Sequence, residues 1–464
     1  MKLFKAKKGI HIPGKKDATA YIETVKYTSP EFVYIPLSVK GTDFEIYVKP
    51  GDYVKLGQKI AERTKEKGLP LIKHASVSGE VVATERQPHS TGMPYMCIKI
   101  KNDFKDTPID AKPLSSLDDR KAILHIIHQA GIVGLGGAGF PTELKYSNVK
   151  DIDTVILNGA ECEPYITADY RIMLENTAEV IDGLVILMKI VDANKGIIVI
   201  KKGKPEVYNA LCEEVKKFNN IKVIEVPDEY PAGWEKQVVY RAVKRSYENL
   251  PFECGVIVNN VATAYAVSNA VRTGLPLVER VVTVSGEAVV SPKNYRVRIG
   301  TPAKELIALS GGVANEFAEV RIVVGGPMMG MAQKNDQFII SETNSAILIF
   351  DSIKEYKVPH NQPVGDVLLD VLHLKESDPR VFIRDEQPCV RCGSCVVHCP
   401  VGLQPTLLRQ ASIAKNDILL GKLDVTKCID CGTCAYVCPS HIYVNEAIKK
   451  GKTYYNVKNR NKKK

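Results

Sequence analysis

Eight of the twelve cysteines lie near the end of the chain, in two copies of one spacing. Each copy reads C-x2-C-x2-C-x3-C and is followed by a proline, first Pro400 and then Pro439. In ligand sets for paired [4Fe–4S] clusters, three thiolates two residues apart bind one cluster, while the fourth points to the other. We therefore expect one cluster on Cys389, Cys392, Cys395 and Cys438, and a second on Cys428, Cys431, Cys434 and Cys399.

Two zinc sites or a disulfide framework are the alternatives for these cysteines. Zinc needs four ligands per site and gives no reason for two identical runs, and disulfides are typical of small secreted chains. Gly393 and Gly432 follow the second cysteine of each run, where the backbone must pass close to inorganic sulfide and a side chain would obstruct it. His398 is expected to be a supporting or surface residue, not a ligand.

A second set of residues could hold a planar or phosphorylated ligand. The stretch GLGGAGFPTELK carries four glycines within residues 134–139, with Lys145 nearby to meet an anion. It spells G-x-G-x-x-G, but the dinucleotide fingerprint requires a strand before the loop, and here a predicted helix precedes it. Ser116 and Asp119 form a predicted capping box for that helix, which Gly131 ends.

The middle of the chain alternates predicted strands and helices, which indicates a mostly parallel sheet with a ligand beyond its carboxyl edge. The strands are predicted at 154–158, 196–201, 222–226 and 255–259, and the helices at 168–191, 205–218, 234–248 and 262–273. Each polar residue after these strands could be a turn former or a cap. Three such strand ends together with a glycine loop favour a pocket.

Four of these motifs resemble those of a known protein family. GLGGAGFPTELK, LNGAECEP, EYPAGWE and VNNVAT resemble the flavin-binding domain of the NADH-oxidising subunit of respiratory complex I, and the whole chain resembles the RnfC family of the Rnf electron transport complex. The resemblance implies non-covalent FMN held by Gly134, Gly136, Gly137, Lys145, Asn158, Glu161, Tyr230, Gly233, Asn259, Asn260 and Thr263. It implies NAD(H) as substrate at Phe140, Glu163 and Glu235.

Two residues depart from the complex I pattern. Ala160 stands where that subunit has an aspartate, and Asn148 stands where it has an aromatic residue used against the adenine. The single-cluster motif of that subunit is also absent, and the two-cluster runs replace it. The resemblance therefore supports FMN more strongly than NADH.

Two further modules are predicted to be rich in strands. Within residues 32–102, VKPGDYVKLGQKI and HASVSGEVV resemble the half-motifs of biotinyl and lipoyl carriers, but the turn at 76–79 lacks the carrier lysine, so we expect a structural or docking module. Residues 281–312 resemble the β-grasp module that follows the flavin domain, which we expect to be a rigid spacer between flavin and clusters. GGPMMG at 325–330 is expected to be a glycine turn with two core methionines.

Composition and charge restrict the class of protein. With 45% hydrophobic and 25% charged residues, the chain is an ordinary soluble globular protein, without a signal peptide or a transmembrane segment of its own. Much of its net charge of +10 lies in the first sixteen residues and in the tail 449–464. We expect a disordered tail, with contact to an anionic membrane surface or an acidic partner as the alternative. No stripe of aromatic and basic residues indicates nucleic acid as a partner.

The expected fold is multidomain α/β and α+β: a β barrel-sandwich, a Rossmann-like α/β flavin domain, a β-grasp module and a helical two-cluster ferredoxin domain. Further helices are predicted at 363–376 and 404–420. The expected boundaries are 1–30 for an N-terminal segment, 31–110 for the barrel-sandwich, 111–280 for the FMN and NADH domain, 281–350 for the β-grasp module, 351–448 for the cluster domain and 449–464 for the basic tail.

The resemblance implies a peripheral electron-input subunit, on the cytoplasmic side of the membrane, of a ferredoxin:NAD+ oxidoreductase coupled to ion transport. NADH gives two electrons as one hydride and each cluster accepts one, so a flavin is needed between them. The implied partners are other subunits of the complex and ferredoxin. One alternative is a soluble flavin and iron–sulfur cobalamin reductase, whose barrel-sandwich follows the cluster domain. Another is an electron-transfer wire without nucleotide binding, which Ala160 and Asn148 keep open.

Overall fold

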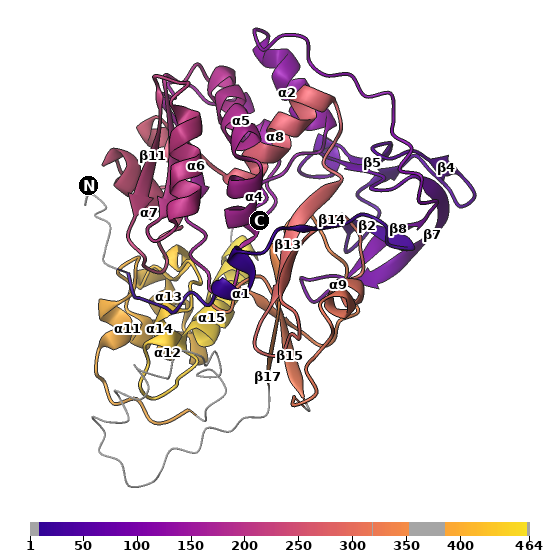
Figure 1. The fold of residues 1–464 in the computed structure, drawn as a ribbon. Helices are drawn as coiled ribbons and strands as arrows, with labels where there is room; N and C mark the ends of the chain where they lie inside the picture. The colour runs from indigo at the N-terminus through magenta and orange to yellow at the C-terminus, as the bar shows by residue number, and fades with distance from the viewer. Residues whose placement is uncertain (1–8, 318, 352–385, 462–464) are drawn as a thin grey trace.

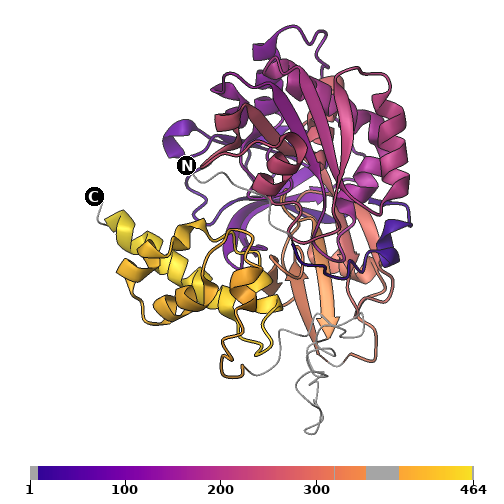
Figure 2. The same ribbon diagram turned by 90° about the vertical axis from the view of Figure 1, so that its left-hand side faces the viewer.

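The computed structural model describes residues 9–317, 319–351 and 386–461. We divide them into an N-terminal β part (32–102), an α/β part (119–274), a second β part (279–351) and a cysteine-rich part (386–461). Figures 1 and 2 show the cysteine-rich part, in orange to yellow, below the α/β part and beside the second β part.

The N-terminal β part consists of two small antiparallel sheets that enclose an apolar core. One has the order β2-β8-β7-β4 and the other β3-β5-β6. Their bounds are β2 Phe32–Ser38, β3 Glu45–Ile46, β4 Tyr53–Val54, β5 Lys59–Arg63, β6 Leu71–His74, β7 Gly79–Pro88 and β8 Pro94–Asn102. Ser76, Val77 and Ser78 are fully buried, and the Ser76 hydroxyl donates to the carbonyl of Ile299 at 2.5 Å. The turn is therefore a docking contact with the second β part.

The α/β part is built on a parallel sheet of order β11-β10-β9-β12. Its strands are β9 Thr154–Gly159, β10 Lys195–Lys201, β11 Ile221–Val226 and β12 Val256–Asn260. Alternate residues of each strand face opposite sides: Ile156 packs with α7 (Glu235–Val243), whereas Leu157 packs with the helices of the other face. These are α2 Arg120–Gln129, α4 Ala168–Glu175, α5 Thr177–Ile190, α6 Pro205–Val215 and α8 Val261–Thr273.

The four predicted strands are present, but three helix predictions are wrong in detail. The single helix predicted at 168–191 is two helices, because Asn176 has φ −134° and ψ 42°, outside the helical region. The helix predicted at 234–248 ends at Val243, because Lys244 is left-handed. Asp119, not Ser116, caps α2 by accepting from the N–H groups of Lys121 and Ala122.

The second β part is a six-stranded sheet of order β1-β14-β13-β17-β15-β16. Its strands are β1 Val25–Tyr27, β13 Glu279–Ser285, β14 Lys293–Arg298, β15 Val320–Val324, β16 Met331–Gln333 and β17 Ala346–Asp351, and α9 (Ala303–Leu309) packs beside them. Gly311 adopts φ +79° after this helix, as predicted for its cap. The edge strand β1 comes from the N-terminus and pairs in parallel with β14.

The N-terminal segment, residues 9–27, crosses the α/β part before it enters this sheet. Ile10 bridges Tyr230, and the carbonyl of Gly14 accepts from the N–H of Tyr165 at 2.7 Å. After α1 (Asp17–Ala20), the carbonyl of Thr19 accepts from the Asn294 side chain at 3.0 Å. The segment therefore joins the α/β part to the second β part.

The cysteine-rich part is helical. Its helices are α11 Ser394–Val397, α12 Pro405–Ile413, α13 Asp417–Lys422, α14 Thr433–Tyr436 and α15 Val444–Asn461. The expectation of a disordered tail is wrong over 449–461, because α15 covers these residues and its Ile448 is buried with Leu408 of α12. The predicted helix at 404–420 is split between α12 and α13, and the one predicted at 363–376 lies outside the described residues. No helix in the described ranges is both long and apolar enough to cross a membrane.

Candidate cofactor-binding site

Two predicted asparagines stand at the carboxyl ends of neighbouring strands. Asn158 of β9 and Asn260 of β12 are directly opposite in the register, so their side chains leave the same side of the sheet. Asn260 caps α8 by accepting from the N–H of Ala262 at 2.8 Å, and its Nδ2 donates to Asp169 at 2.6 Å. Asn158 donates to the carbonyl of Gly233 at 2.9 Å. The structure thus brings Asn158, Gly233 and Asn260 to one corner.

The glycine loop, residues 134–139, lies against the start of α8. The N–H of Leu135 donates to the hydroxyl of Thr263 at 3.0 Å. A Cβ placed on Gly136 would lie 2.7 Å from the Cβ of Asn260, so this contact requires glycine. A Cβ on Gly137 would meet no atom within 4 Å. The loop therefore has one face packed on the strand ends and one face open.

The open face offers donors that fit a flavin phosphate. In the described ranges, the backbone N–H groups of Gly136 and Gly137 make no hydrogen bond to a protein acceptor. Successive N–H groups of this kind bind anions, and glycine lets a planar ligand approach the backbone. The residues present at this loop therefore fit FMN.

Three residues predicted to contact FMN or the nucleotide, Lys145, Asn259 and Glu235, interact with other residues of the protein. The Lys145 amine donates to the carbonyl of Val258, and burial lowers its pKa, against the opposing effect of Glu235. Asn259 donates to the Tyr146 hydroxyl. The distance from the Tyr247 hydroxyl to the Glu235 carboxylate is 2.8 Å. Lys145 and Asn259 therefore support the strand ends in this structure.

Glu161 is engaged on both carboxylate oxygens. One accepts from the N–H of Asp169 at 2.7 Å, and the other is 3.1 Å from the amine of Lys16, whose side chain is 4% exposed. Burial lowers the pKa of Lys16 and raises that of Asp169 to about 7, with Glu161 adding to the rise. Neither Lys16 nor Asp169 was predicted. Lys16 lies 145 residues away from Glu161 in a basic stretch without a motif, and Asp169 resembled an ordinary residue of a first helical turn.

Tyr230 and Glu163 lie where the α/β part meets the second β part and the cysteine-rich part. The Tyr230 hydroxyl donates to the backbone carbonyl of Cys431 at 2.8 Å. The Glu163 carboxylate accepts from the N–H of Met328 at 3.0 Å, and burial raises its pKa to about 7. Phe140, by contrast, is 47% exposed. The three residues predicted to meet the nucleotide, Phe140, Glu163 and Glu235, thus lie in three different environments.

Four cysteines line one cavity in the cysteine-rich part. They are Cys399, Cys428, Cys431 and Cys434, the set predicted for the second cluster. Burial raises the pKa of Cys434, and the nearby Cys431, Cys428 and Cys399 raise it further. Such a group of thiols repels added negative charge until iron neutralises it.

Three cysteines of the set predicted for the first cluster, Cys392, Cys395 and Cys438, lie near one another. The pKa of Cys438 is raised first by burial and then by Cys395 and Cys392. None of the twelve cysteines, all of which lie in the described ranges, forms a disulfide. Within those ranges no three Cys, His, Asp or Glu side chains are close enough for a single metal ion.

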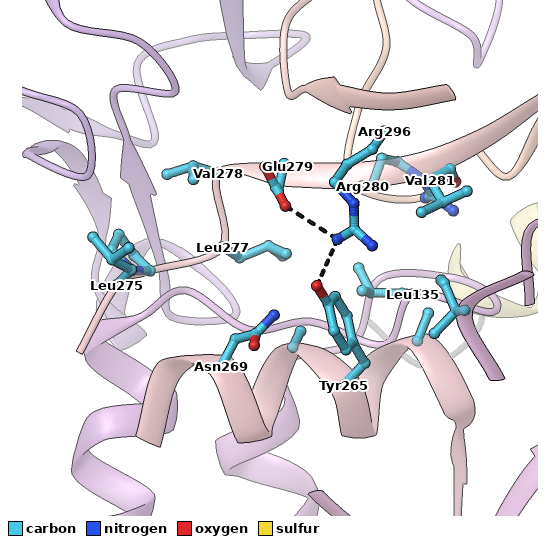
Figure 3. Close-up of a pocket in the computed structure, with 14 residues that line it drawn as sticks. Leu135, Tyr265, Asn269, Leu275, Leu277, Val278, Glu279, Arg280, Val281 and Arg296 are labelled. Carbon is cyan, nitrogen blue, oxygen red and sulfur yellow. Dashed lines mark hydrogen bonds and ion pairs between the residues drawn. The ribbon is translucent and has the colours of Figure 1, made fainter. Parts of the chain in front are cut away.

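A cavity of about 50 Å³ lies behind the glycine loop, between α8 and β13 (Figure 3). Leu135 lines it from the loop, and the Arg296 guanidinium crosses it to the Tyr265 hydroxyl at 2.5 Å and to Glu279 at 3.2 Å. Its volume suits a few water molecules, and no residue predicted to meet FMN or NAD(H) lines it. This cavity is too small for a flavin.

Comparisons with protein families match four successive stretches of the chain. Residues 4–105 match the RnfC barrel sandwich hybrid domain, and 127–269 match the Nuo51 FMN-binding domain. Residues 281–332 match the SLBB domain, and 388–442 match the 4Fe-4S dicluster domain. The order of modules agrees with the expected fold class at this level.

Curated relatives match most of the chain. The RnfC-type protein of the Na+-translocating ferredoxin:NAD+ oxidoreductase complex of Acetobacterium woodii is 37% identical over 88% of this chain and 87% of its own length. Its counterpart in the proton-translocating ferredoxin:NAD+ oxidoreductase complex of Clostridium ljungdahlii is 38% identical over 86% and 82%. A solved NAD+-reducing [NiFe]-hydrogenase superposes on 74% of this chain and 65% of its own, with a TM-score of 0.48 and 17% identity.

Proposed function

Because the chain belongs to the RnfC family of ion-translocating ferredoxin:NAD+ oxidoreductase complexes, we propose that it is the electron-input subunit of such a complex. It is an oxidoreductase subunit with an FMN-binding domain and a [4Fe–4S] dicluster domain. We place it peripherally on the cytoplasmic side of the membrane, with the other subunits and ferredoxin as partners. The boundaries predicted for its domains stay part of this proposal.

One observation carries the proposal: the carboxyl edge of one sheet holds both the open glycine loop and the contact with the cysteine-lined cavity. Asn260 packs against Gly136 of the loop. Asn158 is opposite Asn260 in the strand register, and its side-chain amide donates a hydrogen bond to the carbonyl of Gly233. Tyr230, three residues before Gly233, reaches Cys431. A flavin at the loop and a cluster in the cavity would therefore be neighbours.

The chain's own residues have defined tasks in this reaction. Bound FMN would convert the hydride of NADH into single electrons for the clusters. Gly136 and Gly137 would donate backbone N–H groups to its phosphate, and Asn158 and Asn260 would fix its polar edge. Lys16 and Asp169 hold Glu161 in place, and Glu161 would lie beside the bound flavin. The eight cysteines would hold two clusters, in the cross-ligated sets given above.

The order of modules favours this function over a cobalamin reductase. The barrel sandwich hybrid match covers 4–105, before the FMN-binding match at 127–269, and in the reductase arrangement it would follow the cluster domain. The electron-transfer wire is the second candidate, because the Glu163 carboxylate is already bonded to Met328 and lies 3.5 Å from the Tyr230 hydroxyl.

Anaerobic stopped-flow measurements separate these two candidates. After iron, sulfide and flavin are quantified, the bound flavin is mixed with NADH or NADPH in wild type and in Glu163→Ala. We expect faster reduction by NADH, because carboxylates repel the extra phosphate of NADPH. The variant should bind nucleotide ~1–3 kcal/mol more weakly, with FMN and both clusters retained. No reduction of wild-type flavin by either nucleotide would establish the wire instead.

A further inference from the structure

The two cysteine runs have the same cysteine spacing and similar local backbone, but their environments differ. Gly393 and Gly432, which follow the second cysteine of each run, both adopt left-handed backbone, with φ +78° and +75°. A Cβ on Gly432 would lie 2.9 Å from the backbone carbonyl oxygen of Met328, whereas a Cβ on Gly393 would meet nothing within 4 Å. The second run is therefore docked against the rest of the protein at a point where the first run is open.

The docking surface of the second run comes from three distant stretches. The Tyr230 hydroxyl donates to the carbonyl of Cys431, and Cys431 is 9% exposed in an apolar cluster with Ile10, Ile12, Tyr230 and Met328. Met328 belongs to the glycine turn 325–330, which Glu163 holds through the Met328 N–H. The turn thus lies between the strand end that carries Glu163 and the loop that carries Cys431.

Among the described residues, the hydrogen bonds of the first run stay inside the cysteine-rich part. Cys395 contacts the Thr406 hydroxyl at 3.2 Å, and His398 is 2.9 Å from the carbonyl of Ser394. Val390 and Val397 are 67% and 71% exposed. This run therefore faces away from the α/β part.

We infer that the cluster held by Cys428, Cys431, Cys434 and Cys399 is the inner one, which exchanges electrons directly with the flavin, and that Tyr230 and Met328 are the residues that position it. The inference rests on the proposed function. The other cluster is then the outer one, in contact with the partner. The electron count would balance: bound FMN would take two electrons from NADH as a hydride and release them one at a time, and the clusters held by the two cysteine sets would each accept one electron.

The glycines provide a matched pair of variants. Gly432→Ala and Gly393→Ala carry the same left-handed backbone penalty, but only the first places a Cβ against Met328. Flavin and both clusters are reduced by light-driven photoreduction, so the result does not depend on NADH, and the clusters are followed by freeze-quench EPR. We expect Gly432→Ala to slow electron transfer between flavin and clusters about tenfold or more, as a small displacement does, and Gly393→Ala to leave it unchanged. Equal slowing in both variants, or in neither, would overturn the inference.

Tyr230→Phe tests the same assignment without a change of backbone. It removes the hydroxyl that donates to Cys431 and keeps the ring, so the EPR signal and midpoint potential of the inner cluster should shift while those of the outer cluster stay the same. Cys431→Ser and Cys392→Ser identify which signal belongs to which cluster. A shift confined to the cluster of Cys389, Cys392 and Cys395, or no shift at all, would contradict the inner position. Failure of NADH to reduce the flavin would leave these readouts intact and would refute only the proposed function.

Discussion

Asn260 links the features that shape the flavin corner. It caps α8, donates to Asp169 and packs against Gly136. Asp169 in turn donates its backbone N–H to Glu161, which is bonded to Lys16. A change of charge at any of these buried groups should therefore disturb the conformation of the glycine loop, because a buried hydrogen-bond network that is only partly satisfied lowers the stability of the fold.

The raised pKa of Asp169 predicts a pH dependence of stability. Burial lifts it to about 7 in the folded protein, from about 4 in an unfolded chain. The folded state then binds the proton more tightly, so this group's contribution is fully present below pH ~4 and is lost as pH rises to about 7. Asp169→Asn should make the decline in the unfolding temperature of the loaded protein shallower, leaving the share that comes from Glu163, whose pKa is also raised to about 7. Asp118→Asn, at a side chain 88% exposed, is the control, and parallel profiles for wild type and Asp169→Asn would contradict the prediction.

A substitution at Gly137 should affect flavin binding without affecting folding. Because a side chain here meets no protein atom, Gly137→Val should fold and keep both clusters, yet obstruct a ligand that lies on the backbone. We expect the purified variant to lose most of its flavin, and the flavin of wild type to be released by denaturation. A full flavin content in the variant, or flavin that denaturation cannot release, would show that this part of the site assignment is wrong.

At the scale of elements, the N-terminal segment is attached to the α/β part next to Glu161. Lys16 Nζ donates to the carbonyls of Glu161 and Ile166 and pairs with the Glu161 carboxylate. Both side chains are almost fully buried. For a buried ion pair of this kind, removing one partner lowers the free energy of unfolding more than replacing both partners does.

Lys16→Met should therefore destabilise the protein by ~3 kcal/mol or more, because Glu161 is left buried without its cation. The double variant Lys16→Met, Glu161→Gln should recover part of this loss. Denaturant unfolding monitored by flavin release measures both. If the double variant is no more stable than Lys16→Met, the ion pair is not what holds the segment.

The sequence predicted elements better than contacts. Apolar runs such as TVILN are nearly determined by their composition, and the parallel order brings Asn158 and Asn260 together as expected. Asn176 breaks the long helix without a proline or glycine to signal it. The contacts of Lys16 with Glu161 and of Tyr230 with Cys431 join residues 145 and 201 positions apart, and no local pattern encodes such pairs.

At the scale of the molecule, the two cysteine runs make one unit. Cys399 of the first run lines the cavity of Cys428, Cys431 and Cys434. Cys399→Ser should therefore damage the cluster of the second run, because the fourth cysteine of each run serves the other cluster. EPR of the reduced variant measures this, with Cys254→Ser, outside both runs, as control. Loss confined to the cluster of Cys389, Cys392 and Cys395 would refute cross-ligation.

The parallel pairing of β1 with β14 has a consequence for biosynthesis. Val25 pairs with Tyr295, about 270 residues later, and at ~5–20 residues per second a ribosome needs roughly 15 to 55 s to make that stretch. The residues of β1 must therefore wait, unpaired, while the α/β part folds behind them. Lys16 can meet Glu161 well before β1 has a strand to join, so the nascent chain should dock its N-terminus in two steps, first on the α/β part and later on the second β part.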